Sequence, residues 1–403
     1  MTVRGVEVRF QQRLHTPRWR GVVTPVIAVV VALVICGLLL LITGLNPVST
    51  YQSMVRAAFT SNGAFNQTLA LGTPLLFTGL AASVAFRMKI WNIGGEGQLY
   101  IGAVCAAATG IALGSDGQAI AVPAMLAAGI LGGALWAAIP GLLRAYMNTS
   151  EVLTSLMLNY IAGLLMTYLI FDSNSYWRDV SSAAAKAFPQ GRTIAPASFW
   201  PGFTTGSLVV PLGLVIGLTL AVLLTIVLRS SRFGFQMRVI SDSPGAGRYA
   251  GMNTRHMILG VMLLSGGLAG LGGASQVGDF SHLLDPTGLQ GASFGYAGIV
   301  VAAVARYNPW AVIVGSFLLG AITNAGASLQ GASFPLGLVG TMEGIILLCV
   351  LGAEVFTRYR LSIGRAGSPT ADDVPAPQDA LPRVSPVAVG VSCATRQSGD
   401  ETT

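Results

Sequence analysis

The residues that could hydrolyse a nucleotide or hold a metal ion are few and widely separated. A phosphate-binding loop needs a lysine directly after a glycine, but the two lysines, Lys89 and Lys186, follow a methionine and an alanine. The three histidines are dispersed without metal-ligand spacing, and no nucleophile can be paired with a base. The sequence therefore predicts a protein that is not an enzyme and that has no metal or cofactor of its own.

Polar residues gather at the start of one apolar stretch, WNIGGEGQLY from residue 91. Glu96 would lie in the first turn of a helix, where the helix dipole favours a carboxylate. Alternatively, the stretch is a polar station on a solute pathway, since irregular backbone at membrane depth is tolerated where it lines a cavity. On this second hypothesis the candidate pathway residues are Asn92, Gly94, Gly95, Glu96 and Gln98.

A second polar stretch, SEVLTSLMLNY, begins at residue 150. Glu151, Ser155 and Asn159 are spaced by four and share one helix face. A polar stripe inside a membrane span should face the interior of the bundle, where it either bonds other helices or lines the pathway; both readings stay open. Glu343, in a later apolar run, has no evident Lys or Arg partner inside the membrane.

The elements that must position these residues are membrane helices. Of the 403 residues, 53% are hydrophobic and only 10% are charged, whereas a soluble domain carries roughly 25% charged residues. A membrane helix needs roughly 20 mostly apolar residues, and the eighth candidate is short enough to be tilted, broken or re-entrant. The fold class is thus an all-α polytopic membrane protein of about ten helices, at 22–43, 69–86, 98–114, 119–143, 151–171, 207–228, 257–277, 293–305, 309–328 and 335–355.

The distribution of Lys and Arg predicts the orientation, because cytoplasmic loops carry the excess of these residues. With the N-terminus inside, only Arg56, Arg178, Lys186 and Arg192 of the 23 basic residues fall on outer segments. Both termini are therefore expected in the cytoplasm. The predicted organisation is an N-terminal segment (1–21), a membrane domain (22–356) and a disordered tail (357–403), which is rich in Pro, Ser and Ala.

Small residues recur at a spacing of four in two of these apolar stretches. Gly129/Gly133 and Gly266/Gly270 are such pairs, and small residues at this spacing let helices approach closely. They predict a multi-helix bundle without specifying which one.

Two loops are long enough to have a role of their own. The outer loop 172–206 carries aromatic residues that either anchor it at the membrane interface or dock an external partner: Tyr176, Trp177, Phe188, Phe199 and Trp200. The cytoplasmic loop 229–256 contains Ser243, which can cap a helix, Pro244, which fits a first helical position, and Gly251, which suits the position after the last turn. These signals predict a short helix at 244–250, which is marginal alone and should dock on something.

Several motifs in order resemble one family. They are NIGGEGQLYIGA, SEVLTSLMLNYIA, RFGFQMRVISDSPGAGRYAGMNTRHMILGVMLLSGGLAGLGGASQV and GASFGYAGIVVAAVARYNPWAVIVGSFLLGAITNAGASLQ. Over residues 20–355 the chain resembles permease subunits of ABC importers of the branched-chain amino-acid/ribose/nucleoside class. It is most similar to the nucleoside-type permeases, because sugar-type members carry an Asp-Leu-Ser-like sequence in place of Asn-Ile-Gly-Gly-Glu-Gly-Gln.

The resemblance implies a type II-like bundle in the bacterial inner membrane that conducts nucleosides or purine-like solutes. It also implies three partners: a second related permease in a heterodimer, a cytoplasmic ATPase with tandem nucleotide domains that binds the ATP, and an extracytoplasmic substrate-binding lipoprotein. Nucleic acid is not among them, since the basic residues lie in short loops.

In this family the short loop helix is the coupling helix that docks on the ATPase. Here it corresponds to Ser243, Pro244, Arg248, Tyr249, Ala250, Gly251 and Met252. The family usually has an acidic residue after the proline and an alanine pair before the Arg-Tyr, whereas this chain has Gly245, Ala246 and Gly247. Each extra glycine weakens the helix by up to roughly 1 kcal/mol. The family gives Glu343 no role.

Three alternatives were weighed beside nucleoside import. The first is a simple-sugar importer of the same class. The second is a proton-coupled secondary transporter that uses Glu96, Glu151 or Glu343, and the third is a membrane scaffold that transports nothing.

Overall fold

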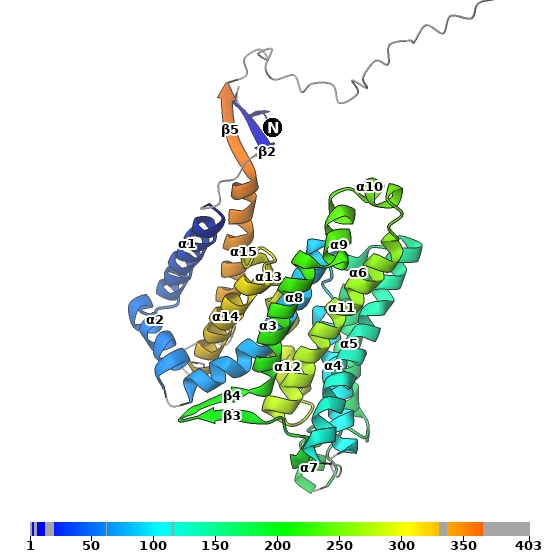
Figure 1. The fold of residues 1–403 in the computed structure, drawn as a ribbon. Helices are drawn as coiled ribbons and strands as arrows, with labels where there is room; N and C mark the ends of the chain where they lie inside the picture. Colours follow the sequence, from blue (N-terminus) through cyan, green and yellow to red (C-terminus); the bar gives the residue numbers. More distant parts are fainter. Residues whose placement is uncertain are drawn as a thin grey trace, which may run out of the picture. The chain divides into compact units, whose positions relative to one another are not determined.

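A computed structural model of the chain describes residues 2–3, 6–12, 20–61, 63–113, 117–181, 183–329 and 337–365. The chain forms a large unit, His15–Arg358, and a small unit that joins Met1–Leu14 to Tyr359–Thr403. Almost all of the large unit is helical, and its helices run between two opposite ends (Figure 1).

The α-helices of the large unit follow one another with few strands between them. They are α1 (Arg20–Ile42), α2 (Pro47–Val55), α3 (Ala64–Arg87), α4 (Gly95–Ala112), α5 (Gln118–Met147), α6 (Glu151–Thr167), α7 (Ala183–Ala187), α8 (Leu212–Ser230), α9 (Arg232–Asp242), α10 (Pro244–Tyr249), α11 (Thr254–Ser275), α12 (Pro286–Ala292), α13 (Phe294–Val304), α14 (Pro309–Leu329) and α15 (Leu338–Arg358). Shorter helical turns are η1 (Arg56–Thr60), η2 (Tyr168–Asp172), η3 (Pro196–Ser198) and η4 (Gln276–Ser281).

The prediction of an all-α polytopic membrane protein is confirmed in outline. Helices occupy all ten predicted stretches. Seven helices within the described residues are long and apolar enough to cross a membrane, or up to eight if the sharply bent pair Ile27–Ile42 and Pro47–Thr60 counts as one span. The number of ten spans therefore stays a prediction.

The prediction missed α2, which begins directly after the bend that follows α1. The Asn46 side chain accepts a hydrogen bond from the Val48 amide at 3.0 Å, and Pro47 occupies the first helical position. A polar cap followed by proline is a helix start signal, so this helix could have been predicted. The two helical pieces are bent by 118°.

Two further differences lie beside α8. The predicted span began at residue 207, but residues up to Pro211 belong to a hairpin of β3 (Gly202–Thr205) and β4 (Leu208–Pro211). At the other end, α9 occupies part of the expected loop 229–256. Its cap, the Ser231 hydroxyl, accepts a hydrogen bond from the Gly234 amide at 3.2 Å.

The short eighth span is a broken helix. α12 and α13 meet at Ser293, whose backbone is left-handed (φ 48°). A non-glycine residue in this region is uncommon and interrupts the helical hydrogen bonds. Together the two pieces are long enough to span a membrane, so one of the predicted alternatives, a broken helix, describes this segment.

Close glycine contacts hold the centre of the bundle. α11 packs against α5, α4 and α3. A Cβ atom added to Gly133 would overlap the Gly266 carbonyl oxygen, and one added to Gly270 would overlap that of Gly129. The two small-residue pairs seen in the sequence therefore face each other, as expected for close helix packing.

Gly133→Leu is expected to lower the melting temperature of the purified protein, because neither helix can move away without opening the core. Overpacking a well-packed interior typically costs about 1–3 kcal/mol, and here the obstacle is backbone. Gly344→Leu is the matched control, since Gly344 is exposed on α15 and has nothing within 4 Å of an added Cβ. Equal melting temperatures for the two variants, measured in detergent, would show that this contact does not hold α5 to α11.

The small unit contains a three-stranded sheet in the order β1 (Thr2–Val3), β2 (Val6–Gln12) and β5 (Tyr359–Arg365). β2 and β5 pair antiparallel over their full length. The expected disorder of the tail from residue 357 is therefore wrong for 357–365, which continue α15 and form β5. Residues 366–403 lie outside the described residues.

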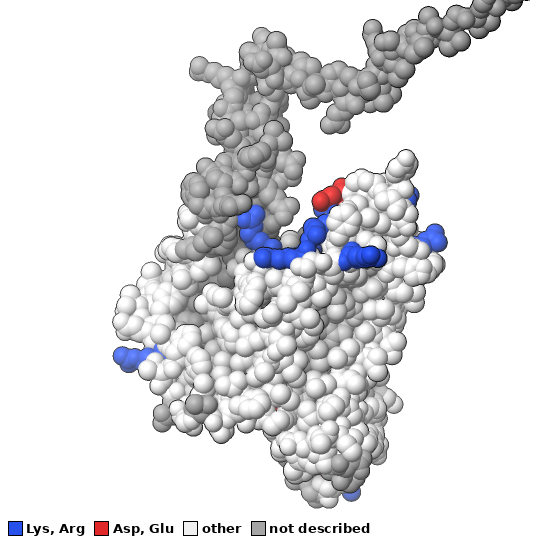
Figure 2. Space-filling model, viewed as in Figure 1, with Lys and Arg blue, Asp and Glu red and all other residues white. Residues whose placement is uncertain are grey.

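Charge divides the large unit into two different ends. α10 lies at one end and the β3–β4 hairpin at the other (Figure 1). Lys and Arg gather at the end with α9 and α10, and a broad uncharged band separates this end from the few basic residues elsewhere (Figure 2). Such a band is what lipid hydrocarbon requires of a spanning surface.

Candidate functional site

The loop before α4 is organised by a pair of buried amides. Asn92 donates to Gln98 Oε1 at 3.1 Å and to Ser265 Oγ at 2.9 Å, while its own oxygen accepts from Gln98 Nε2 at 3.0 Å and from the Gly94 amide at 3.1 Å. Both side chains are almost fully buried. Their hydrogen bonds are used inside the protein, so Asn92 and Gln98 shape the loop rather than contact a solute.

Gly94 and Gly95 allow this loop to approach neighbouring helices. A Cβ atom at Gly94 would lie 3.0 Å from the Ser155 Cβ, and one at Gly95 would lie 3.9 Å from the Gly295 Cα. Any side chain at Gly94 would push α6 away from the loop. Gly94 is therefore a packing position, whereas the 3.9 Å contact at Gly95 is an ordinary van der Waals distance.

Glu96 lies in the first turn of its own helix, α4, as expected, and it also caps a second helix, α13. Its carboxylate accepts hydrogen bonds from the amides of Gly295 (2.5 Å) and Tyr296 (3.1 Å) in the first turn of α13, and from the Tyr100 hydroxyl (2.6 Å). The break at Ser293 exposes the amides of α13 in mid-bundle, where an anion is favoured by the helix dipole, and Glu96 supplies that anion.

The predicted stripe on α6 faces the interior, as expected. Glu151, Ser155 and Asn159 are all buried. Asn159 joins the two polar motifs: its oxygen accepts from the Gly97 amide at 2.8 Å, and its nitrogen donates to the Ile93 carbonyl at 2.9 Å and to the Tyr296 hydroxyl at 3.2 Å. The two stretches that the sequence singled out therefore meet in one site.

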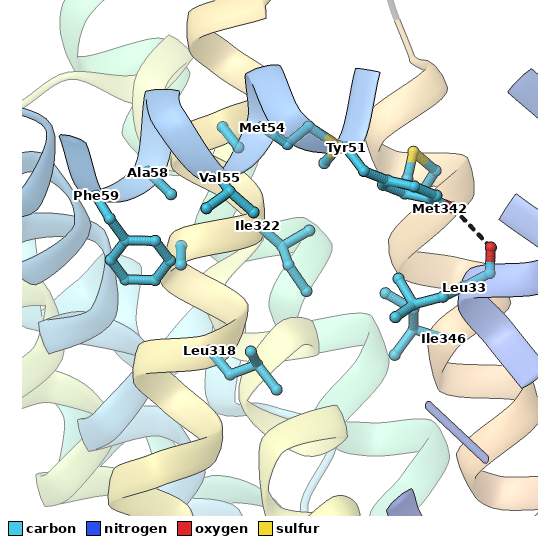
Figure 3. Close-up of a pocket in the computed structure, with 12 residues that line it drawn as sticks. Leu33, Tyr51, Met54, Val55, Ala58, Phe59, Leu318, Ile322, Met342 and Ile346 are labelled. Atoms are coloured by element: carbon cyan, nitrogen blue, oxygen red, sulfur yellow. Dashed lines mark hydrogen bonds between the residues drawn. The ribbon is translucent and has the colours of Figure 1, made fainter. Parts of the chain in front are cut away.

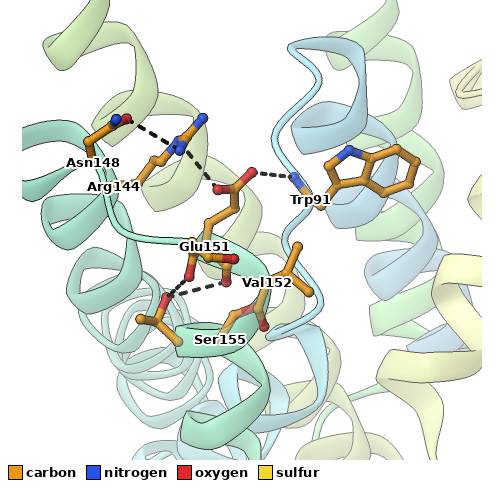
Figure 4. Close-up of polar contacts among 8 residues, drawn as sticks. Trp91, Arg144, Asn148, Glu151, Val152 and Ser155 are labelled. Atoms are coloured by element: carbon orange, nitrogen blue, oxygen red, sulfur yellow. Dashed lines mark hydrogen bonds and ion pairs between the residues drawn. The ribbon is translucent and has the colours of Figure 1, made fainter.

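Glu151 lies apart from this site, at the start of α6 (Figure 4). Its carboxylate forms an ion pair with Arg144 Nε at 3.3 Å and accepts from the Trp91 amide at 3.4 Å. Ser155 donates back to the Val152 carbonyl at 3.2 Å. The Glu151 contacts join α5, α6 and the loop before α4, whereas the Ser155 hydrogen bond stays within α6.

A pocket of about 250 Å³ opens beside Glu96 and Asn159. Its polar wall includes Tyr100 and Tyr296, and the remaining lining comes from residues that the sequence reasoning missed: Tyr160, Gly163, Leu164, Thr167, Gln290 and Ser293. We call this space the α6–α13 pocket. It combines amide and hydroxyl groups with phenol rings, the mixture of polar anchors and apolar walls that binds small molecules.

A signal for part of this wall was present in the sequence. Gly163 and Thr167 continue the four-residue spacing of Ser155 and Asn159 along the same helix face. Gln290, by contrast, lies far along the chain in the broken helix, where no periodicity marks it. The structure brings it to α6, where its Nε2 donates to Thr167 Oγ at 2.9 Å and to the Gly163 carbonyl at 3.2 Å.

A second pocket, of about 390 Å³, lies between the bent α1–α2 pair and α14–α15 (Figure 3). Its lining is aliphatic and aromatic, including Met54, Phe59 and Met342. The Tyr51 hydroxyl in its wall is already bonded to the Leu33 carbonyl at 2.6 Å. With so little polar surface it cannot orient a hydrogen-bonding solute, so the α6–α13 pocket is the better solute site.

The predicted loop helix is present as α10, from Pro244 to Tyr249. The Ser243 hydroxyl accepts from the Ala246 amide at 3.3 Å, Pro244 begins the helix, and Gly251 has a left-handed backbone (φ 74°). All three signals are confirmed, although the helix ends one residue earlier than expected.

Hydrogen bonds within the loop and a contact with α9 hold α10 in place. Ala250 and Met252 donate their amides to the Ala246 and Gly247 carbonyls at 3.0 and 2.9 Å, and Arg248 Nε reaches the Pro244 carbonyl at 3.4 Å. Gly247 is buried against Ile240 of α9, whereas the Tyr249 side chain is 98% exposed. α10 thus presents a large aromatic residue to solvent at the basic end of the molecule.

The aromatic residues of the outer loop are divided between the interior and the surface. Trp177 donates to the Val104 carbonyl at 2.9 Å, Trp200 is buried, and Phe199 stacks on His282 with ring centroids 3.8 Å apart. Tyr176 and Phe188 are exposed. The first three pack the loop onto the bundle, which leaves the other two for the interface or a partner. Glu343 lies on α15, but its side chain lies outside the described residues.

The chain is similar to known transport proteins over most of its length. Residues 64–351 match the family described as "Branched-chain amino acid transport system / permease component". The glucose ABC transporter permease protein TsgB13 of Haloferax volcanii is 30% identical over 92% of this chain and 97% of its own. The guanosine permease NupP of Bacillus subtilis is 31% identical over 83% and 94%, and the nucleoside permease NupB of Lactococcus lactis 27% over 82% and 91%. No solved structure gives a significant match.

Proposed function

From the premise that this chain belongs to the branched-chain amino acid transport system / permease component family, we propose that it forms the import pathway for nucleosides or purine-like solutes. The family membership makes the chain a multi-pass ABC permease subunit of the cell membrane. Its relatives are transporter permease subunits rather than enzymes. What is proposed beyond this is the solute, the orientation and the way in which this chain meets its partners.

The solute is inferred from the α6–α13 pocket. Tyr160 is 65% exposed and Tyr296 38% exposed, so each offers a ring face on which a flat base can stack. The oxygen of Gln290 accepts no hydrogen bond within the described residues and could accept one from a ribose hydroxyl or a base amine. This pairing of aromatic faces and an amide carries the proposal, and the names of the guanosine and nucleoside relatives support it.

A simple sugar is the second candidate solute, because a relative that is similar over nearly the whole chain is named as a glucose permease. Sugar hydroxyls could use the same amide and hydroxyl groups. Proton-coupled transport is less favourable, since Glu96 already accepts three hydrogen bonds and Glu151 is paired with Arg144.

Ten spans with both termini in the cytoplasm remain our proposed topology. The antiparallel pairing of β2 with β5 supports an even number of crossings. Contacts also group the loops as this topology expects: Lys89 pairs with Asp242 and Arg87 donates to the Tyr307 carbonyl at the α10 end. At the opposite end, Asn66 donates to the Ser207 carbonyl.

Family members work with an ATPase and a substrate-binding protein, and α10 is the proposed contact with the ATPase. Its position at the basic end of the bundle (Figure 2) and its exposed Tyr249 support this assignment. We further propose that the ATPase has tandem nucleotide domains and binds the ATP, so that this chain needs no cofactor. A second, related permease would close the open side of the α6–α13 pocket.

Tyr160→Ala is expected to raise the KM for guanosine uptake, because the base loses one stacking surface. Stacking on an aromatic side chain contributes about 1–3 kcal/mol per base, which corresponds to roughly 5- to 150-fold in affinity. Tyr160→Phe should keep most of the affinity. Tyr168→Ala is the control, since Tyr168 is an exposed tyrosine on η2 that does not line the pocket. A KM that changes equally in both alanine variants would remove Tyr160 from the site.

Deleting the gene and measuring uptake of labelled guanosine and labelled glucose tests the proposed solute. The proposal expects guanosine uptake to fall while glucose uptake stays unchanged, in a strain without another nucleoside importer. Loss of glucose uptake alone would favour the second candidate. Unchanged uptake of both solutes would contradict both.

A further inference from the structure

The end of the bundle that carries α9 has a second polar pocket, of about 240 Å³, separate from the α6–α13 pocket. Three arginines line it: Arg87 at the end of α3, Arg238 on α9, and Arg306 just after α13. Leu228 and Met237 add apolar walls, and the lining includes no Asp or Glu. We call it the arginine pocket. Three segments that are far apart in sequence therefore direct positive charge into one small space.

The protein neutralises little of this charge. Within the part of the chain that the structure describes, ion pairs join Lys89 to Asp242 and Arg144 to Glu151, and none includes a pocket arginine. Arg87 Nε donates to the Tyr307 carbonyl at 2.9 Å and Arg238 Nη1 to the Leu228 carbonyl at 2.7 Å. A guanidinium has five N–H donors, so each keeps several for a ligand.

The three guanidinium groups that line the pocket carry the same charge and repel one another. The arginine cluster is therefore less favourable without a bound anion. Arg306 is also held on a left-handed backbone (φ 48°), a sparsely populated conformation for a non-glycine residue. A bound anion would offset the repulsion, and guanidinium groups match phosphate oxygens particularly well.

The pocket lies at the ends of two helical segments that are long and apolar enough to span a membrane, which is where the phosphate groups of a bilayer are expected. Arg87 is the last residue of the candidate span Ala64–Arg87, and Arg306 lies two residues after the end of Pro286–Val304. Basic pockets between membrane helices on this side are known to hold anionic headgroups.

We propose that the arginine pocket binds a phosphate group, supplied by an anionic phospholipid of the leaflet at the α9–α10 end. The charge, the size and the position of the pocket each agree with this ligand. The inference does not depend on which solute the permease carries. It requires only that the chain lies in a membrane, which its family membership establishes.

The test compares the complete transporter in vesicles of phosphatidylcholine alone with the transporter in vesicles of phosphatidylcholine and phosphatidylglycerol. The expected result is a higher melting temperature in the anionic vesicles and phosphatidylglycerol that stays bound through detergent extraction. R238Q/R306Q should lose both effects, because it removes two of the three charges that line the pocket. Both side chains are exposed, so the variant is expected to fold. R232Q/R255Q removes the same charge outside the pocket lining and should keep both effects.

A wild-type transporter that responds equally to neutral and anionic vesicles would overturn the proposal, as would an undiminished response in R238Q/R306Q. Inorganic phosphate is added to the neutral vesicles as a separate arm. Full stabilisation by free phosphate would assign the pocket to a soluble anion and overturn the lipid as its source. If R238Q/R306Q instead keeps the lipid response and loses the ATPase, the pocket is a protein contact and the proposal is wrong.

Discussion

Glu96→Ala is expected to abolish solute uptake and to lower the stability of the purified permease. The carboxylate is 2% exposed and holds two backbone amides of α13 and the Tyr100 hydroxyl. Hydrogen bonds to a charged group contribute about 1.5–3 kcal/mol each, and the donors left behind stay buried without an acceptor. The expected loss of unfolding free energy therefore exceeds about 3 kcal/mol. Melting temperature in detergent and labelled-guanosine uptake in cells are the measurements.

The loss of stability and uptake is expected to be specific to Glu96, because its carboxylate accepts hydrogen bonds from the amides at the start of α13, where the helix is broken. Glu96→Gln keeps one acceptor oxygen in place, so it should be intermediate in both measurements. Asp172→Ala is the control, because Asp172 is an exposed carboxylate at the end of η2. If Glu96→Ala keeps full stability and full uptake, the carboxylate does not hold α13 and the account of the broken helix is wrong.

Tyr249→Ala is expected to uncouple the permease from its ATPase without affecting its folding. The side chain is 98% exposed at the end of α10, so its removal leaves no cavity in this chain. An aromatic residue in a pocket of a partner typically contributes about 2 kcal/mol or more to binding, which is roughly thirtyfold in Kd. ATPase affinity and solute-stimulated ATP hydrolysis of the purified complex should both fall, and melting temperature of the permease alone should not.

Gly251→Pro tests the same helix through its backbone. Gly251 has φ 74°, whereas proline is restricted to about −65°, so α10 would be displaced from its docking position. Phe188→Ala is the control, since Phe188 is an exposed aromatic residue in the outer loop. Coupling helix docking would be contradicted if Tyr249→Ala and Gly251→Pro both retain the ATPase affinity of Phe188→Ala.

Short sequence signals such as helix caps and residue spacing were sufficient to predict individual helices and their buried faces. The cap, proline and glycine of the 243–251 loop predicted α10, and the spacing of Ser155 and Asn159 predicted a buried face. The same signals were present but unused at Asn46–Pro47 and at Ser231, where α2 and α9 begin. The number of spans, predicted from the apolar stretches, and their orientation, predicted from Lys and Arg, remain a proposal.

The site itself depends on contacts between distant segments, which periodicity cannot predict. Glu96 was correctly placed in the first turn of its own helix, but nothing in the sequence shows that α13 begins beside it. Ser293 adopts a left-handed backbone without the glycine that would have signalled a break. Gln290 and Tyr296 reach the pocket only because that break turns α12 and α13 against α6.

The central claim, ATP-driven nucleoside import through this chain, is tested most directly in proteoliposomes that contain the permease with its partner permease, ATPase and binding protein. Labelled guanosine should accumulate only when ATP is supplied to the ATPase, and it should continue to accumulate when the proton gradient is collapsed. Accumulation should be lost with Tyr249→Ala. Accumulation without ATP, or entry of glucose and not of guanosine, would contradict this account.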